Sequence, residues 1–562
     1  MTAQSMPHQQ VLKVFTGLLA TLLVATLSST IVTSTLPTIL AELNGTQSHY
    51  TWVVTAMLLT STVTTPIWGK LADLFSKKML YQVAIAIFTV GCVLGGFSQT
   101  MPQLIAFRAV QGIGLGGLQS LVQAVIAALI VPRERGRYGG YIGAIFAIST
   151  ASGPLVGGLL VDSPLGWRWT FWVCVPITVI AFIVLGRILK LPVVKYDVSI
   201  DWFGATFIVG GVALLLVWIT LAGKSFAWLS WHTAALLGGS AVLIALAVYV
   251  ESKVREPVIP LHLFHNRTFT LAVVASLAVG TTMFVGTVFL VQYFQISRGF
   301  SPSIAGLLTL PMVIGMVCAS TITGRIVSRI GRTKPFLLGG SLPLLAGLFL
   351  LASVDHATNL VWMSVFLTLL GIGVGSVMQN LVLVAQNTVG MRYVGVATAA
   401  VTFFRTLGGA IGVSALGAVL SAQVSDITAA SLAARGLHAD AHVSAGSLDF
   451  DALPAPVADI VRAAYGDATG TLFLISAALA VITAVSVLFI KEAPLRDTFD
   501  LADKPTPTPP TPANSHTPTR VRNPRSTPPR RSPRPSRRPR TRSRRFQIRR
   551  TAGTRAPARR NL

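Results

Sequence analysis

The chain has 562 residues, 52% of them hydrophobic and only 11% charged, and its mean hydropathy is +0.67. This composition excludes a soluble globular protein and indicates a chain that lies largely within a lipid bilayer. The net charge of +26 does not indicate nucleic-acid binding, because 18 of the charges come from residues 504–562, which contain one Lys, seventeen Arg and no acid.

The first apolar segment begins near Val11 and runs on to residue 40, so it predicts a membrane span rather than a cleavable signal peptide. A hydrocarbon core about 30 Å thick needs roughly 20 apolar residues per helix, and segments of that length recur along the chain. The predicted spans, in chain order, are 11–40, 50–68, 80–98, 102–131, 138–161, 169–190, 203–223, 231–250, 268–294, 303–323, 335–353, 360–389, 394–421 and 470–490. The predicted fold class is therefore all-α, a polytopic membrane protein with fourteen spans.

Basic residues are concentrated in the short loops that follow even-numbered spans. These loops carry Lys70, Lys77, Lys78, Arg133, Arg135, Arg137, Arg187, Lys190, Lys195, Lys253, Arg255, Arg267, Arg325, Arg329, Arg332 and Lys334. Loops after odd-numbered spans carry only scattered basic residues, such as Arg168 and Lys224. The positive-inside rule therefore places the basic loops in the cytoplasm, together with residues 1–10 and the C-terminus. We expect a multi-pass protein of the bacterial plasma membrane.

The chain contains an internal duplication. Residues 69–78 (GKLADLFSKK) match residues 324–334 (GRIVSRIGRTK), and the glycine pattern of residues 112–116 recurs at residues 371–375. The duplication predicts two six-helix halves with a substrate site between them near the midplane, which rocking of the halves exposes alternately to each side. The predicted parts are an N-terminal bundle (11–190), two linker spans (203–250) and a C-terminal bundle (268–490).

The segment from Gly69 to Lys78 resembles the signature loop between spans two and three of the major facilitator superfamily, in particular its fourteen-span drug/proton antiporter branch. The resemblance covers roughly residues 11–495. It implies a gate made by Gly69, Asp73, Lys77 and Lys78, in which Asp73 forms a charge-assisted latch between cytoplasmic helix ends. The alternative interpretation is a turn with solvated charges.

Arg108 lies in predicted span four and resembles the arginine of the family's R-x-x-x-G motif, which lies in the transport path. An arginine at this depth is costly unless it is paired or faces water. Our hypothesis is that Arg108 helps to bind substrate or sets the resting state, with Ser28 and Thr30 as polar neighbours; wild-type transport by Arg108→Ala would disprove it. The alternative is a guanidinium held by backbone carbonyls and hydroxyls. Arg405 in span thirteen is a second charged candidate.

The predicted fifth span resembles the antiporter motif G-x(8)-G-P-x-x-G-G, with a slightly longer gap after Gly143. Its residues Gly153, Pro154, Gly157 and Gly158 predict close helix packing and a bend, and so a hinge. In the family this motif marks exporters rather than importers. The resemblance therefore implies multidrug efflux as the function.

The first span departs from the family pattern, because Ser28 stands where that pattern has an intramembrane aspartate. None of the nineteen acids lies clearly in the middle of a predicted span, and the midplane also lacks histidine. A carboxylate site for lipophilic cations is therefore not supported, and neutral or anionic substrates become relatively more favoured. Proton coupling, expected from the family, is left with Asp73 or an arginine-linked water network as its carrier.

Other polar residues within spans are candidates for the lining of the path or for hydrogen bonds between helices. They are Gln111, Gln119, Gln123, Gln292, Gln379, Asn380, Gln386 and Asn387. Aromatic residues are candidates for a hydrophobic cavity or for core packing, namely Phe146, Phe284, Phe289, Phe403 and Phe404.

Two further segments lie outside the predicted spans. Residues 504–562 are rich in Pro, Thr, Ser and Arg, which predicts a disordered cytoplasmic tail that associates with anionic lipids rather than with a specific nucleic acid. Residues 422–469 predict a long external loop with short helices around Ser431 to Arg435 and Val457 to Tyr465, either a lid or a passive insertion.

The function predicted from the sequence is secondary active export of lipophilic small molecules by a monomer, with proton antiport. The alternative is a lipid or metabolite carrier of the same fold, with uptake or another coupling. No catalytic constellation, P-loop or metal-ligand spacing is present, so we expect no enzyme activity, no metal and no cofactor.

Overall fold

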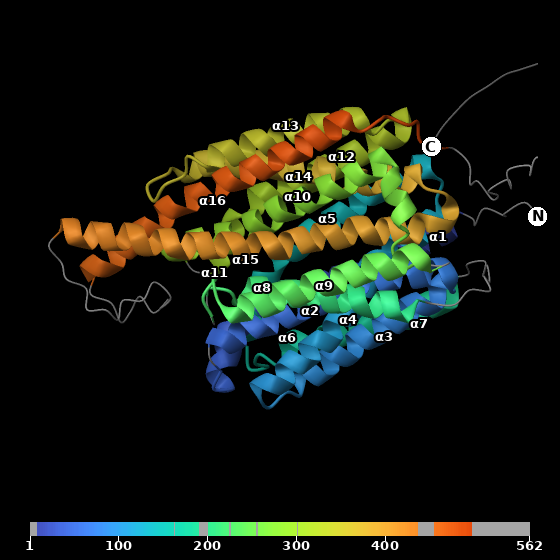
Figure 1. Ribbon diagram of the computed structural model, residues 1–562. Coiled ribbons are helices and arrows are strands. Elements are labelled where there is room, and N and C mark those ends of the chain that lie inside the picture. Colours follow the sequence, from blue (N-terminus) through green and yellow to red (C-terminus); the bar gives the residue numbers. More distant parts are fainter. Residues whose placement is uncertain are drawn as a thin grey trace, which may run out of the picture. The chain divides into compact units, whose positions relative to one another are not determined.

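A computed structural model describes residues 8–45, 47–161, 163–189, 201–223, 226–254, 257–300, 302–435 and 455–496. Helices account for nearly all of this part of the chain, and it contains no β-strand (Figure 1). The predicted tail at residues 504–562 lies outside the described residues.

The helices form two bundles and a connecting pair. The N-terminal bundle consists of α1 (His8–Glu42), α2 (Gln47–Leu74), α3 (Lys77–Gly96), α4 (Met101–Leu129), α5 (Pro132–Val161), α6 (Trp169–Trp172) and α7 (Cys174–Ile188). The linker pair is α8 (Trp202–Leu221) and α9 (Trp231–Lys253). The C-terminal bundle consists of η1 (Leu261–His265), α10 (Arg267–Gln292), η2 (Tyr293–Ser297), α11 (Pro302–Leu308), α12 (Leu310–Ile330), α13 (Lys334–Leu351), α14 (Leu360–Thr388), η3 (Met391–Tyr393), α15 (Val394–Ala434) and α16 (Ala455–Phe489).

Thirteen helical segments of the described chain are long and apolar enough to cross a membrane. The remaining long helix, α2, is less apolar because Thr60, Ser61, Thr64 and Thr65 lie along it, and their hydroxyls donate to carbonyls of the same helix. This bonding satisfies the hydroxyls inside the bundle, so α2 can lie among the other spans. With α2 included, the helices correspond to the fourteen predicted spans.

The helices differ from the predicted spans in two places. The tenth span is interrupted at Thr309, between α11 and α12, because Pro311 has no N–H to bond to the preceding turn. The predicted external loop 422–469 is largely helical, since α15 continues to Ala434 and α16 begins at Ala455; only residues 436–454 lie outside the described chain. Residues 422–434 contain no Gly or Pro, and helix formers with apolar residues four apart extend α15 against α16.

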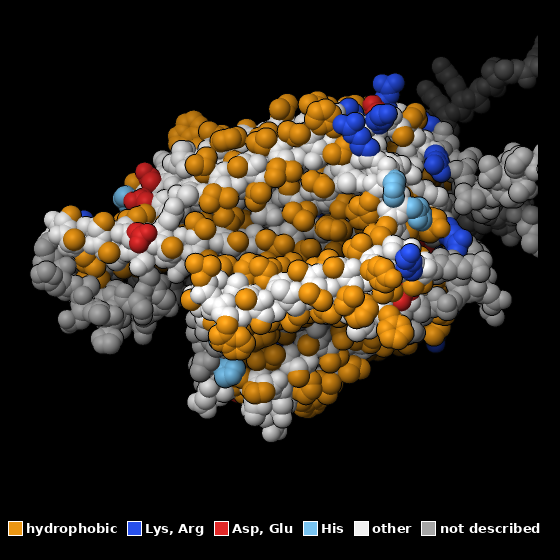
Figure 2. Space-filling view, in the orientation of Figure 1, with side chains coloured by type: hydrophobic (Ala, Val, Ile, Leu, Met, Phe, Trp, Pro, Cys, Tyr) orange, Lys and Arg blue, Asp and Glu red, His pale blue; other side chains and the backbone are white. Residues whose placement is uncertain are grey.

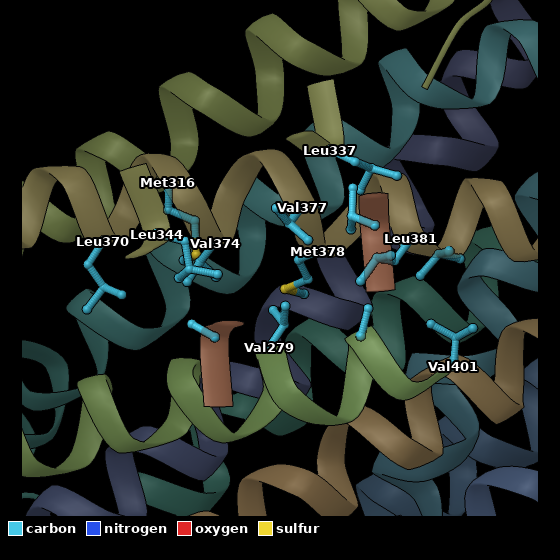
Figure 3. Packing of buried hydrophobic residues seen from close by; sticks show 14 of the residues in the cluster. Val279, Met316, Leu337, Leu344, Leu370, Val374, Val377, Met378, Leu381 and Val401 are labelled. Carbon is cyan, nitrogen blue, oxygen red and sulfur yellow. The ribbon is translucent and has the colours of Figure 1, made fainter. Parts of the chain in front are cut away.

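Each bundle has its own hydrophobic core. Figure 3 shows Val374, Val377 and Leu381 of α14 packed among side chains that include Leu344 of α13 and Val279 of α10. A separate cluster fills the N-terminal bundle, with side chains from α1, α3 and α4 at its centre. The two cores define the two halves that the duplication predicts.

The glycine motifs 112–116 and 371–375 confirm the duplication in three dimensions. The outer glycines of the first motif approach the backbone of α2, and those of the second approach the backbone of α12. The middle glycines approach α3 and α13, respectively. A Cβ on any of these glycines would stand less than 3 Å from a neighbouring helix. Each half therefore packs its fourth helix between its second and third in the same way.

The linker pair lies against both halves. Helix α8 contacts α2 of the N-terminal bundle and α15 of the C-terminal bundle (Figure 1), and Ile208 shares a hydrophobic cluster with Val63 and Leu407. The pair therefore covers the seam between α2 and α15 along one side.

The two ends of the helices differ in charge. Figure 2 shows hydrophobic side chains over most of one face and Lys and Arg side chains gathered toward one end of it. We call this the basic end; α1 and α15 begin there, and α2 and α12 end there.

Candidate functional site

At the basic end, Asp73 of α2 joins the two bundles. Its carboxylate accepts hydrogen bonds from Gly395 N at 2.9 Å and from Val396 N at 2.8 Å, at the beginning of α15. A helix N-terminus carries unpaired N–H groups and a partial positive charge, so it is a favourable place for a carboxylate. Gly69 lies one turn earlier on α2, where an added Cβ would stand 2.2 Å from the Cβ of Ala399. The signature motif therefore sets a tight crossing of α2 and α15.

The duplicated motif forms the matching contact between α12 and α5. Ser328 occupies the place of Asp73 in the repeat, and its hydroxyl accepts from Arg137 N at 2.8 Å at the beginning of α5. Gly324 occupies the place of Gly69, and a Cβ there would stand 2.2 Å from Gly136 O. The two halves are therefore closed against each other at two equivalent crossings.

The other two predicted gate residues differ in their contacts. The Lys77 ammonium is close enough to Asp73 to act on it electrostatically. Lys78 makes no hydrogen bond or ion pair within the described part of the chain. Of the predicted gate residues, Gly69, Asp73 and Lys77 thus lie at the crossing.

A short segment after α16, residues 491–496, lies across the same seam; we call it the strap. Its Arg496 carbonyl accepts from Arg133 N of α5 at 3.1 Å, and its Leu495 N donates to Gly331 O at 3.0 Å. Asn387 of α14 donates to the carbonyls of residues 493 and 494. The Leu495 side chain is buried beside Val327 of α12. The strap therefore ties both halves together at the basic end.

A small polar cavity lies behind the α5–α12 crossing. Its polar lining consists of Gln123, Arg135, Ser320, Gln379, Asn380 and Gln386. The cavity has room for water rather than for a drug-sized molecule. Four of the amides that the sequence put forward as lining residues are therefore brought together here.

Arg135 is a site residue that the sequence did not single out. Its guanidinium is buried and donates to Ala127 O at 2.6 Å, to Ile130 O at 2.8 Å and to Gln386 Oε1 at 3.5 Å. Gln386 in turn donates to Thr398 Oγ1 at 2.9 Å. The sequence showed Arg135 only as one of several loop cations, and no pattern distinguished it from its neighbours.

Arg108 is buried inside the N-terminal bundle and belongs to a closed network. Its guanidinium donates to Gln111 Oε1 at 2.6 Å and to Val53 O at 3.4 Å. Gln111 Nε2 then donates to Ser28 Oγ at 2.9 Å and to Cys92 Sγ at 3.0 Å. The network links α1, α2, α3 and α4 within one half.

Thr30 and Gln119 do not belong to this network. Thr30 donates to Ser149 O of α5 at 3.0 Å, and Gln119 is half-buried with no hydrogen bond within the described residues. The expected grouping of Ser28 and Thr30 around Arg108 is therefore wrong for Thr30, which faces α5 from the other side of α1.

The four residues of the span-five motif face different neighbours. Gly153 and Gly157 pack against α1, where added Cβ atoms would stand 2.2 Å from Thr30 Oγ1 and 2.6 Å from Ser34 Oγ. Pro154 faces α11, across the seam from Gly306. Gly158 has no neighbouring atom within 4 Å of an added Cβ. Close packing therefore involves two of the four residues.

Arg405 of α15 is buried at the seam between the halves. Its guanidinium carbon lies 5.9 Å from the ring centroid of Phe146, which belongs to α5 of the other bundle. Its Nη1 has no hydrogen-bond partner among the described residues. Arg405 thus differs from Arg108, whose polar contacts lie within one half.

Two buried carboxylates, Asp201 and Glu251, also lie at the basic end, and no sequence pattern singled them out. Asp201 caps α8 by accepting from Gly204 N at 2.9 Å, and its Oδ2 has no described partner. Glu251 of α9 accepts from Val258 N at 3.0 Å and from Ile259 N at 3.1 Å. A Cβ on Gly204 would stand 2.2 Å from Asp201 Oδ2 and 3.1 Å from Glu251 Oε1, so both carboxylates flank the same point.

The opposite end has its own fixed contacts. His356 Nδ1 lies 2.9 Å from Asp467 Oδ1 of α16. The hydroxyl of Thr358 donates to Asp355 at 2.7 Å and holds the pKa of that carboxyl below its ordinary value. The His356–Asp467 contact joins the α13–α14 loop to α16, away from the seam residues.

Comparison with known proteins agrees with this arrangement. Residues 18–413 match the sequence profile of the Major Facilitator Superfamily. The chain is 36% identical to an uncharacterized MFS-type transporter of Mycobacterium tuberculosis (strain ATCC 25618 / H37Rv), over 87% of this chain and 71% of that protein. It is also 36% identical to the multidrug transporter protein MdtP of Bacillus subtilis (strain 168), over 73% of this chain and 75% of that protein.

A solved structure shares the fold. The proton:xylose symporter XylE superposes with a TM-score of 0.55 at 15% sequence identity, over 87% of this chain and 98% of XylE. The duplicated bundles, the paired crossings at the basic end and the match over most of the chain lead to one assignment. The chain is a member of the Major Facilitator Superfamily of membrane transporters.

Proposed function

We propose that the protein exports lipophilic small molecules across the bacterial plasma membrane by alternating access, with proton antiport and with its basic end in the cytoplasm. The observation that carries this proposal is the Asp73 carboxylate, which bonds the beginning of α15 across the two halves. The basic loops support the orientation, and the similarity to a multidrug transporter supports export.

Alternating access requires the closed seam to open. Most bonds across it end on backbone groups, including those of Asp73 to α15 and those of Ser328 and the Arg133 guanidinium between α5 and α12. Arg135 and Gln386 add a long side-chain bond across it at 3.5 Å. Small residues such as Gly69 and Gly324 let the helices meet closely without interlocking side chains. Such surfaces can separate as rigid bodies, with little repacking inside either bundle.

Proton coupling requires a carboxylate whose protonation changes the seam. Protonated Asp73 would lose its charge-assisted bonds to Gly395 and Val396, and this loss favours opening of the cytoplasmic side. Asp201 and Glu251 offer a second buried pair, next to the α2–α15 seam that the linker helices cover. The proposal therefore places proton exchange at the cytoplasmic ends of α2, α8 and α9, and it does not use Ser28.

The test is transport by purified full-length protein in proteoliposomes with an imposed pH gradient. Lipophilic neutral, anionic and cationic fluorophores serve as probes, and their movement is followed with the gradient present and after its collapse by an ionophore. We expect transport against the probe gradient that stops when the pH gradient collapses. Transport that is independent of the pH gradient would contradict antiport, and accumulation only in the uptake direction would contradict export.

A further inference from the structure

Arg405 lies deep in the membrane-spanning region. It follows the beginning of α15 by eleven residues, which places it about 16 Å along the helix from the basic end. In a hydrocarbon core about 30 Å thick this is close to the midplane. The side chain is only 3% exposed, so its charge is separated from bulk water.

The guanidinium of Arg405 is not neutralised by the protein. Among the described residues, its Nη1 has no hydrogen-bond partner and no acidic group acts on it electrostatically. Arg108 and Arg135, also buried, instead donate to backbone carbonyls and glutamine oxygens. A buried cation with an open donor is unfavourable unless a ligand supplies the acceptor.

A second open donor meets the same face of α5. Gln379 of α14 has a buried Nε2 with no partner in the part of the chain that the structure describes, and its side chain lies 3.5 Å from the Cβ position of Gly139 and 3.6 Å from that of Gly143. Residues 139, 143 and 146 follow one another on one face of a helix. Gln379 and Arg405 therefore meet α5 about one turn apart. Both belong to the C-terminal bundle, so both lie across the seam from α5.

The chemistry of this surface suits one kind of ligand. The Arg405 guanidinium lies beside the aromatic ring of Phe146, Gln379 meets α5 at positions 139 and 143, and the described spans contain no carboxylate at this depth. A planar guanidinium binds carboxylate or sulfonate groups with two parallel hydrogen bonds. A lipophilic cation would instead meet a like charge that nothing offsets.

We infer that Arg405, with Gln379 and Phe146, recognises the charged group of the substrate, and that the substrates are amphipathic organic anions. The inference rests on the proposed export function and specifies its substrate class. Phe146 belongs to one half and the two donors to the other, so separation of the halves on either side opens the site to that side. In the closed arrangement both donor groups, Arg405 Nη1 and Gln379 Nε2, are buried and have no acceptor among the described residues.

The test uses three probes that share one fluorophore and differ in charge: dansylglycine, its neutral primary amide, and the dansyl derivative of ethylenediamine. Binding to the purified full-length protein in nanodiscs is followed by fluorescence for the wild type, Arg405→Gln and the control Arg187→Gln. Arg187 lies exposed at the end of α7, so the control removes the same charge far from the seam.

We expect the wild type to bind the anion at least tenfold more tightly than the amide. Arg405→Gln should weaken anion binding tenfold or more and change amide binding by less than twofold, whereas Arg187→Gln should change neither. Unchanged anion binding by Arg405→Gln, or a wild type that does not prefer the anion, would overturn the inference. If Arg405→Gln does not fold, Arg405→Lys should retain the preference with three- to tenfold weaker anion binding, and equal binding of anion and amide by Arg405→Lys would overturn it.

Transport of the same probes separates this inference from the proposed function. Export of the amide or the ammonium probe without preference for the anion would overturn the inference and leave export intact. No export of any probe by protein that binds the anion would overturn the proposed function and leave anion recognition intact.

Discussion

At the scale of single residues, Asp73 and Ser328 show how a duplicated motif is used twice with different chemistry. Asp73 accepts from two backbone N–H groups of α15, whereas Ser328 accepts from one N–H of α5. The carboxylate adds charge to the hydrogen bonds, and the hydroxyl does not. The α2–α15 crossing is therefore the one of the two whose bonds depend on the charge of a carboxylate.

The first prediction concerns Asp73→Asn. An amide offers one oxygen and no charge, so the closed seam should lose about 1–2 kcal/mol, and the population of the open state should rise about tenfold. Maleimide labelling of Ala399→Cys, buried under Gly69, measures this opening in a background in which Cys318 is replaced by Ser. Lys78→Gln is the control, since Lys78 has no described bond. Equal labelling rates in Asp73→Asn and Lys78→Gln would show that Asp73 is not a latch.

Arg108 was expected in the transport path, and its contacts favour a role in holding the N-terminal bundle together. A sequence pattern shows that a charged residue is buried, but it does not show which groups satisfy that residue. Here Gln111 Oε1 and Val53 O satisfy it inside one half. Arg108 and Gln111 lie three residues apart on one helix, so their pairing was predictable from the sequence. The contact of Arg108 with Val53 was not, because it depends on how α2 packs.

The second prediction is that Arg108→Lys lowers stability more than binding. Lysine cannot reach both acceptors in the same fork geometry, and each buried acceptor left unpaired costs about 1–3 kcal/mol. We expect a lower unfolding temperature by differential scanning fluorimetry, with affinity for the dansyl probes changed by less than twofold. An unchanged unfolding temperature together with lost probe binding would place Arg108 in the substrate site instead.

At the scale of helices, glycines decide where the two halves meet. The α5–α12 crossing brings Gly324 so close to Gly136 that a Cβ added at Gly324 would stand 2.2 Å from Gly136 O. The span-five glycines Gly153 and Gly157 serve a different contact, with α1 in the same half. Gly324 therefore matters for opening of the seam, whereas Gly153 and Gly157 matter for packing within the N-terminal bundle.

The third prediction compares two alanine substitutions. Gly324→Ala places a Cβ 2.2 Å from Gly136 O, so the basic end should close poorly, and labelling of the cysteine at position 399 should rise about tenfold. Gly158→Ala meets no atom within 4 Å, and it should leave the labelling rate unchanged. Similar labelling in both variants would mean that the α5–α12 crossing does not control opening.

The sequence predicted helices better than helix ends. Apolar length predicted fourteen spans, because each must cross the same hydrocarbon thickness, and thirteen helical segments of the described chain are long and apolar enough to do so. It missed the extension of α15 to Ala434, since residues beyond the bilayer no longer need to be apolar and are held by α16 instead. It also missed the strap, because the bonds of residues 491–496 run through backbone groups that carry no sequence signature.

At the scale of the whole transporter, duplication explains the seam. The equivalent helices α2 and α12 each cross a helix of the facing half at the basic end: α2 crosses α15, and α12 crosses α5. The linker helices cover one side of the seam at α2 and α15, and the strap covers the other at α5, α12 and α14. The duplication could be recognised in the sequence. The positions of the linker helices and the strap over the seam could not, because they depend on which surfaces face each other after folding.

The central claim is that export requires the basic-end seam to open, and a reversible cross-link tests it most directly. A Cβ at Gly136 stands 3.1 Å from Ser328 Oγ, within reach of a disulfide between Gly136→Cys and Ser328→Cys. The measurement is export of a dansyl probe from proteoliposomes by this double variant in a Cys318→Ser background, before oxidation, after oxidation and after reduction, with each single cysteine as a control. We predict that oxidation lowers export at least tenfold in the double variant alone and that reduction restores it; full export with the seam cross-linked would contradict the account.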